Sequence, residues 1–177
     1  MGKKLNAITN DLKEFIEQQK IFFVGTAANE GRVNISPKGT DSFRVLEKNK
    51  IVWLNLTGSG NETAAHLIKN NRMTIMFCAF EGSPLILRLY GIAQIYHHED
   101  QKFQQYINLF PKNAGARQII EMNIDLVQTS CGFAVPFMDF NKERTTLNNW
   151  ATKQGKEKIK EYWKKKNNTS IDGYKTK

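Results

Sequence analysis

Between residues 21 and 96 the chain alternates short apolar segments with turn sequences, and this succession limits the possible fold more than any other feature. The segment 21–27 (IFFVGTA) is apolar and partly β-branched, residues 29–31 (Asn-Glu-Gly) form a turn signal, and residues 32–36 alternate polar and apolar side chains. Pro37 has no N–H to donate, so regular strand pairing should end there. This part of the sequence therefore predicts a β-hairpin.

Further segments follow the same pattern. Strands are expected at 43–47, 51–56, 73–80, 85–96 and 124–135, the first two joined by the turn at residues 48–50. Because the strands follow one another in hairpins, with helices outside the run, the pattern favours an antiparallel barrel over βαβ units. We expect a mainly β fold, a six-stranded antiparallel split β-barrel with peripheral helices. With no internal repeat and no low-complexity linker, residues 1–177 should form one domain.

Helices are expected at four places. In the first, Asn10 or Asp11 should cap the first turn and Glu14 should close a capping box. Its apolar face would consist of Leu12, Phe15 and Ile16. The other predicted helices cover 62–69, 99–110 and 142–166, the last divided around Gly155.

Composition limits the class of protein. Of 177 residues, 40% are hydrophobic and 24% charged, which suits a folded domain rather than a disordered chain. No apolar run approaches the ~20 residues of a membrane span, and the first 30 residues lack a signal pattern. Cys78 and Cys131 form no CxxC pair, so reduced thiols in a cytoplasmic protein are expected, with a single buried disulfide as the alternative.

The net charge of +9 is concentrated near the C-terminus. From residue 153 onward there are nine lysines and three acidic residues, a net +6, whereas residues 1–152 carry only +3. This distribution favours a solvated helical face, and nucleic acid is not the expected partner.

A glycine-rich segment, Thr57–Thr63 (TGSGNET), joins an expected strand to an expected helix. Its glycines allow a sharp turn, and the helix's first N–H groups and positive dipole end favour an anion, most naturally a phosphate. The segment matches neither GxGxxG nor GxxxxGK[ST], so dinucleotide and P-loop sites are not indicated. The alternative is an ordinary helix start, capped by Asn61 or Ser59, that binds nothing.

Two cations are candidates for the same anion. Arg88 stands in the apolar segment 84–91, where an unpaired buried charge is costly, so it needs either a carboxylate of this chain or a ligand phosphate. Lys38 follows Ser36 and Pro37 at a strand end. Together with Thr57–Thr63, these residues suggest one phosphate-bearing ligand.

The remaining polar residues indicate no other site. His66, His97 and His98 lack the spacing of metal ligands, so no metal site is expected. No serine lies in a GxSxG context and neither cysteine has a neighbouring base, so no covalent nucleophile is expected either.

Four blocks of sequence carry a family resemblance. They are 31–39 (GRVNISPKG), 53–67 (WLNLTGSGNETAAHL), 77–82 (FCAFEG) and 87–91 (LRLYG). Together they resemble the pyridoxamine 5′-phosphate oxidase-like family of FMN-binding split barrels, and the ending 166–173 (KNNTSIDG) resembles the tail of an uncharacterised branch of it. The resemblance implies a homodimer with FMN at the subunit interface and a small-molecule substrate.

The resemblance also implies which residues hold FMN, although it assigns no catalytic residue. The candidates are Val33, Asn34, Ile35, Ser36 and Lys38 along the isoalloxazine and ribityl chain; Leu56 and Thr57 at the next strand end; Ser59, Asn61, Glu62 and Thr63 around the phosphate; Arg88 on a strand lining the site; and Trp150, with residues 170–172, over the substrate side.

Three departures from the family pattern matter. Val33 stands where pyridoxamine phosphate oxidases carry an arginine, and Glu62 and Thr63 stand where they carry an Arg-Lys pair. Their C-terminal Arg-x-His-Asp-Arg segment is also missing. Glu62 suits the helix dipole but opposes a phosphate unless its side chain turns away. Oxidation of vitamin B6 is therefore not the expected activity.

The leading hypothesis is an FMN-dependent oxidoreductase of unassigned substrate that transfers hydride through the flavin. The alternative is a non-catalytic carrier or sensor of the same fold that binds flavin or haem. A third hypothesis, a nucleic-acid-binding protein, would depend on the lysines of residues 153–177.

Overall fold

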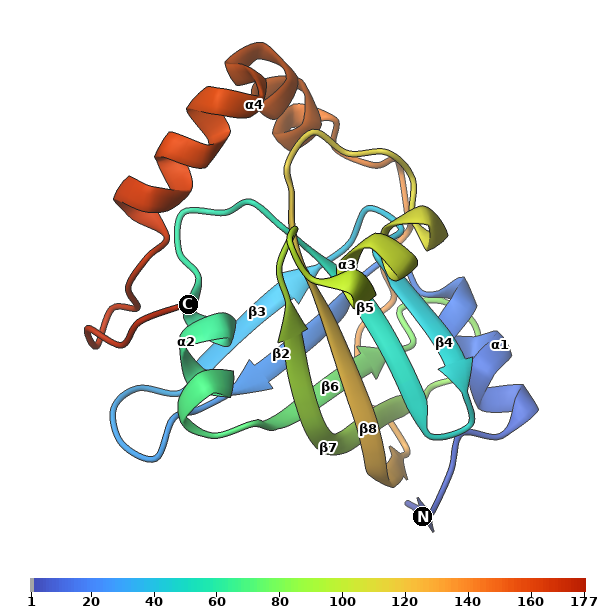
Figure 1. The fold of residues 1–177 in the computed structure, drawn as a ribbon. Helices are drawn as coiled ribbons and strands as arrows, with labels where there is room; N and C mark the ends of the chain where they lie inside the picture. Colours follow the sequence, from blue (N-terminus) through green and yellow to red (C-terminus); the bar gives the residue numbers. More distant parts are fainter. Residues whose placement is uncertain (1) are drawn as a thin grey trace.

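The computed structural model of the protein describes residues 2–177, which form one curved antiparallel sheet with helices around it (Figure 1). The strands are β1 (Lys4–Leu5), β2 (Phe22–Thr26), β3 (Asn34–Lys38), β4 (Phe43–Glu47), β5 (Lys50–Leu56), β6 (Arg72–Cys78), β7 (Ile86–Tyr96) and β8 (Ala116–Ser130). The helices are α1 (Asn10–Gln18), α2 (Glu62–Lys69), α3 (Gln101–Tyr106) with the 3₁₀ turn η1 (Ile107–Leu109), and α4 (Thr146–Lys166).

The strand order is β3-β2-β6-β7-β8-β5-β4, with β1 added to β8, and every pairing is antiparallel. The end strands β3 and β4 are not paired with each other, so the barrel is open. The mainly β antiparallel class is confirmed, but the sheet has eight strands rather than six.

Alternation of side chains along the strands builds the core. Val24, Ile75, Leu87 and Leu89 face inward and are fully buried, since successive side chains of a strand point to opposite faces. A smaller cluster lies under α3, around Phe103. Helix α4 has few buried side chains and arches away from the sheet (Figure 1).

Two local predictions near the N-terminal half are wrong. Helix α1 is capped by Thr9, whose hydroxyl accepts a hydrogen bond from the Leu12 N–H at 3.3 Å, and not by Asn10 or Asp11. Strand β3 continues through Pro37 to Lys38, with Pro37 opposite Phe23. Proline is tolerated there because β3 is an edge strand.

The last strand lies earlier in the chain than predicted. It occupies Ala116–Ser130, whereas the sequence pattern placed it at 124–135. Residues 116–123 pair with β5 and residues 119–130 with β7, and its 15 residues make it the longest strand in the part of the chain that the structure describes. The chain leaves the sheet after Ser130, and Gly132 there has a φ of +67°, a conformation that suits glycine.

The C-terminal helix is interrupted as predicted. Gly155 has a φ of +76° within α4, and the helix begins at Thr146 rather than at residue 142. Cys78 and Cys131 are both free thiols. None of the helices in residues 2–177 has the length and apolar character that crossing a membrane requires.

Candidate functional site

The glycine-rich segment, the start of α2, strand β3 and the start of β8 enclose a chamber of about 240 Å³, here called the Lys38–Arg117 chamber. Its lining residues are Asn34, Ser36, Lys38, Asn55, Gly58, Ser59, Gly60, Asn61, Glu62, Thr63 and Arg117. Because side chains alternate along a strand, the even-numbered residues of β3 share the face that lines the chamber. Seven residues proposed from the sequence thus lie together.

Lys38 brings a positive charge into the chamber. Its ammonium lies 5.3 Å from the centre of the Trp53 ring, and no ion pair within residues 2–177 involves it. Burial, and then the charge of Arg117, lower the pKa of Lys38 from 10.5 to about 8. A nearby anion would stabilise the protonated form of such a lysine, because an opposite charge raises its pKa again.

Arg117 is the second cation of the chamber, and the sequence analysis missed it. Its side chain is 6% exposed. One guanidinium nitrogen, Nη1, donates to the Gly60 carbonyl at 3.0 Å and to Asn167 Oδ1 at 2.7 Å. Burial lowers its pKa to about 10, and the opposing effect comes from Tyr162 rather than from a carboxylate. Arg117 is therefore a buried charge held only by neutral oxygens of residues 2–177.

Several polar atoms of the chamber lack a hydrogen-bond partner. Within residues 2–177, six buried side-chain polar atoms are unpaired, and four of them belong to lining residues of the chamber. These four are Ser36 Oγ, Asn55 Oδ1, Asn61 Oδ1 and Arg117 Nε. Buried polar groups are nearly always paired, so this concentration indicates a place for a polar ligand.

Glu62 does not direct its carboxylate at the two cations. Both of its oxygens lie 3.1 Å from the backbone nitrogen of Ile171, which donates to them. The side chain is thereby engaged by the C-terminal segment. Asn61 stands at the N-cap position of α2, but its Oδ1 accepts no capping bond, and its Nδ2 donates to the Asn167 carbonyl at 3.3 Å. The capping role suggested for Asn61 is wrong.

The C-terminal segment, residues 167–177, hydrogen-bonds to residues that line the chamber but does not line it itself. Asn167 is 2% exposed, and its Nδ2 donates to the Gly58 carbonyl at 3.1 Å in addition to its bond with Arg117. Farther along, Asp172 accepts from the backbone N–H of Arg32 at 2.8 Å and forms an ion pair with that side chain. The segment thus connects the glycine-rich loop to the turn before β3.

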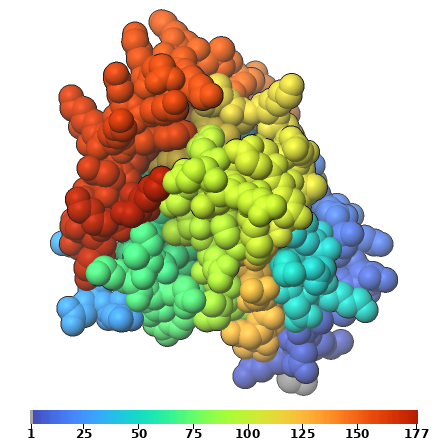
Figure 2. Space-filling model, viewed as in Figure 1, coloured from blue at the N-terminus to red at the C-terminus, as the bar shows by residue number. Residues whose placement is uncertain are grey.

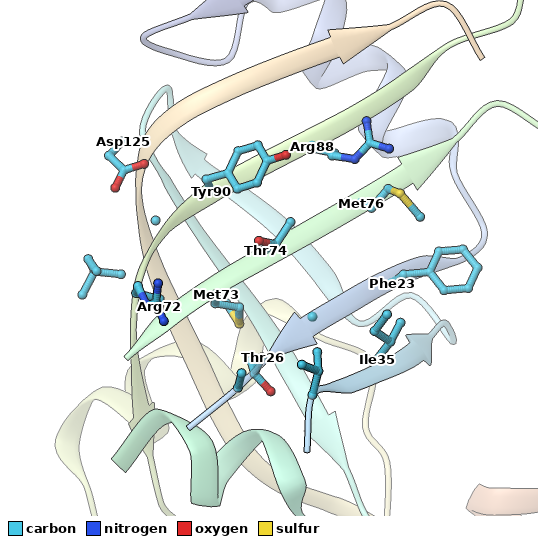
Figure 3. A pocket seen from close by; sticks show the side chains of 15 residues that line it. Phe23, Thr26, Ile35, Arg72, Met73, Thr74, Met76, Arg88, Tyr90 and Asp125 are labelled. Atoms are coloured by element: carbon cyan, nitrogen blue, oxygen red, sulfur yellow. The ribbon is translucent and has the colours of Figure 1, made fainter. Parts of the chain in front are cut away.

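Arg88 lies in a different cleft, of about 530 Å³, on the outer face of β2, β3, β6 and β7 (Figure 3). Its Nη1 donates to Ser130 Oγ at 3.1 Å, and within residues 2–177 no carboxylate pairs with it. Val33 and Ile35, each 71% exposed, line the same cleft. Within the single chain, Arg88 therefore does not lie together with the start of α2.

Three further proposed residues, Leu56, Thr57 and Trp150, do not line the chamber. Thr57 Oγ1 donates to the Gly115 carbonyl at 2.8 Å and accepts from Trp163 Nε1 at 2.8 Å. Leu56 packs against the smaller core cluster. Trp150 stacks edge-on with Tyr162, with ring centres 5.3 Å apart. In residues 2–177 no group of three or more histidine, cysteine or acidic side chains is placed to hold a metal ion.

Comparison with known proteins identifies the family. Residues 8–131 match the family model described as Pyridoxamine 5'-phosphate oxidase. Over 145 residues the chain is 37% identical to the Pyridoxamine 5'-phosphate oxidase family protein ustO of Aspergillus flavus, covering 79% of this chain and 58% of that protein. The chain therefore belongs to the pyridoxamine 5′-phosphate oxidase family. It spans a little over half the length of this curated relative.

Solved structures show the same fold. A putative pyridoxamine 5′-phosphate oxidase from Lactobacillus delbrueckii superposes with a TM-score of 0.56 at 16% identity, over 71% of this chain and 98% of that one. A histidine-to-alanine variant of HupZ from Group A Streptococcus gives 0.56 at 19% identity, over 70% and 99%. The FAD binding protein of Mycobacterium smegmatis gives 0.50 at 11% identity, over 71% and 97%.

Proposed function

We propose that this protein is an FMN-dependent oxidoreductase and that the Lys38–Arg117 chamber holds the phosphate of the flavin. The observation that carries the proposal is a pair of cations at the positive end of α2, Arg117 buried and Lys38 half-buried, neither of which forms an ion pair within residues 2–177. A phosphate supplies the missing negative charge and accepts from their N–H groups. Membership of the family, and a neighbour of the same fold described as FAD-binding, support a flavin as its source.

The chain's own residues would divide the work of binding. Arg117 and Lys38 neutralise the phosphate, and the N–H groups at the start of α2 donate to it. The unpaired oxygens of Ser36 and Asn61 offer hydrogen bonds to hydroxyl or phosphoryl groups beside it. Bound FMN supplies hydride transfer to or from a substrate. The protein's task is then to orient the ligand and to exclude water from the two cations.

We propose further that two copies of the chain form the working unit, with the flavin at their interface. The outer-face cleft supports this proposal. Ile35 in β3, and Val33 just before it, expose apolar side chains there, while other residues of β3 line the chamber. Exposed apolar side chains of this kind favour contact with another protein surface. Arg88 lies on that outer face and would meet the second protomer rather than its own chamber.

The proposal is tested with purified protein in two steps. Mass spectrometry of the ligand released on denaturation, with a visible absorbance titration of added FMN, should show one flavin per chain. Anaerobic mixing with NADH or NADPH should then bleach the flavin absorbance. Protein that neither carries nor takes up FMN contradicts the proposal. Bound flavin that stays oxidised with both donors favours the non-catalytic alternative.

A further inference from the structure

A second, larger hollow lies beneath α4. It measures about 1050 Å³ and is bounded by α4, the loop before α3, the start of β8 and the C-terminal segment. Figure 2 shows the recess between α4 and the region of α3. This volume lies just above the usual range for small-molecule sites.

The side chains around the hollow are mostly positive. Five cations line it, namely Arg117, Lys156, Lys160, Lys164 and Lys177, against one acid, Glu99. Lys177 pairs with Glu99, and Lys160 pairs with Glu157. Three cations, Arg117, Lys156 and Lys164, have no ion pair within residues 2–177. The hollow therefore favours a ligand with negative charge.

The same hollow has an aromatic and apolar wall. The rings of His98 and Trp163 lie 5.4 Å apart at an interplanar angle of 31°, and Ile159 and Ala151 are buried beside them. Burial lowers the pKa of His98, so this ring is neutral at pH 7. A planar ring can pack against such a wall without competing with a charge.

Arg117 and Asn61 line both the hollow and the Lys38–Arg117 chamber. Each is more than nine-tenths buried and each carries one unpaired polar atom, Arg117 Nε and Asn61 Oδ1. The two cavities thus share a wall made of groups that need a polar partner.

We propose that the hollow beneath α4 is a second binding site, for an anionic ligand with a planar aromatic ring, of the kind that a nucleotide's phosphate and base present. This second site shares Arg117 and Asn61 with the proposed flavin site, and in that respect the proposal rests on the proposed function. A nucleotide could nevertheless bind in the hollow of a protein that binds no flavin. The nucleotide unit has two sources: the adenylate half of a flavin dinucleotide whose other half enters the chamber, or a separate mononucleotide. The lysines of α4 attract the phosphate, and Trp163 packs against the base.

The test uses adenosine 5′-monophosphate (AMP), FMN and FAD as probes. Each is titrated by calorimetry into ligand-free protein, and quenching of Trp163 fluorescence, absent in Trp163→Phe, reports the hollow. The triple variant Lys156→Gln/Lys160→Gln/Lys164→Gln removes charges that line the hollow. The variant Lys158→Gln/Lys165→Gln/Lys166→Gln removes the same charge from lysines of α4 that do not line it.

We expect AMP to quench Trp163 in protein that holds no flavin. The first triple variant should weaken AMP binding at least tenfold and leave the affinity for FMN within about twofold of the native value. The second triple variant should leave both affinities unchanged. FAD binding tighter than FMN identifies the dinucleotide source, and AMP binding to FMN-loaded protein identifies the separate nucleotide. The proposal is overturned if AMP does not bind and the affinities for FMN and FAD are equal. It is also overturned if both triple variants lose the same amount of AMP affinity. AMP binding without FMN binding contradicts only the flavin assignment.

Discussion

Arg88 and Arg117 lie on neighbouring strands, β7 and β8, and differ sharply in their surroundings. Arg88 is half-buried on the outer face, where it donates to a serine hydroxyl. Arg117 is almost fully buried and lies in a chamber with a second cation. Both interrupt apolar strands in the sequence, yet only one is in a place where an anion is needed. Burial, rather than an apolar sequence context, is therefore the reason for proposing Arg117 as the anion-binding cation.

The largest expected effect comes from removing the buried arginine. Arg117→Met should weaken FMN binding by about 100-fold, because charge-assisted hydrogen bonds to phosphate contribute about 1.5–3 kcal/mol. Arg88→Met should weaken it less than about tenfold, since this side chain lies outside the chamber. Fluorescence titration of FMN measures both. An equal or larger loss with Arg88→Met would reverse the comparison.

Lys38 allows affinity and stability to be separated. Lys38→Met should weaken FMN binding about tenfold, yet raise the Tm of the ligand-free protein by about 2–4 °C, as about 1 kcal/mol does in a chain of this size. The gain is expected because the native state no longer holds a poorly solvated charge. Lys48→Met, at an exposed position, is the control and should change neither quantity. A Tm that falls with Lys38→Met would show that the charge is already compensated.

The lowered pKa of Lys38 gives FMN binding a pH dependence. The affinity should fall above pH 8, by up to about tenfold per pH unit, because the free lysine then loses its proton. The unfolded chain binds more protons than the native one between pH 8 and 10.5, so the contribution of Lys38 to stability should rise over that interval. Titrations at pH 7, 8 and 9, with thermal unfolding at each pH and compared with Lys38→Met, measure both effects. Parallel pH profiles would assign the dependence to another group.

The smallest effect concerns the acid beside the chamber. Glu62→Gln should strengthen FMN binding by about threefold, because it removes a negative charge while an amide oxygen still accepts from the Ile171 N–H. The gain should shrink in high salt, which screens partly exposed charges. Fluorescence titration at two salt concentrations measures it. Weaker FMN binding in this variant would instead give the carboxylate a positive role.

Local patterns in the sequence predicted much of the fold, and together with the family resemblance they named seven of the eleven residues that line the chamber. The bounds of β4 and α2 match the prediction because alternation and a helix start are encoded within a few residues. Strand β8 was placed too late, since the polar residues Arg117 and Gln118 obscure the apolar pattern at its start. They lie there because they line the chamber and its neighbouring hollow.

Contacts between distant segments could not be predicted. The bond from Arg117 to Asn167 joins residues 50 positions apart, and no periodic pattern encodes it. The sequence did contain one indication of this residue: Arg117 stands two positions before the adjacent isoleucines at 119 and 120. Arg88 was predicted as the phosphate-binding arginine instead. Its strand was recognised in the sequence, whereas the start of the strand that holds Arg117 was not.

The measurement that tests the central claim most directly is the ratio of riboflavin to FMN dissociation constants, because the two ligands differ only in the phosphate. The native protein should bind FMN at least about 100-fold more tightly than riboflavin. In the Lys38→Met/Arg117→Met double variant the ratio should fall close to one, with riboflavin affinity nearly unchanged. A native ratio near one, or a large ratio that survives in the double variant, would contradict the assignment of this chamber to the phosphate.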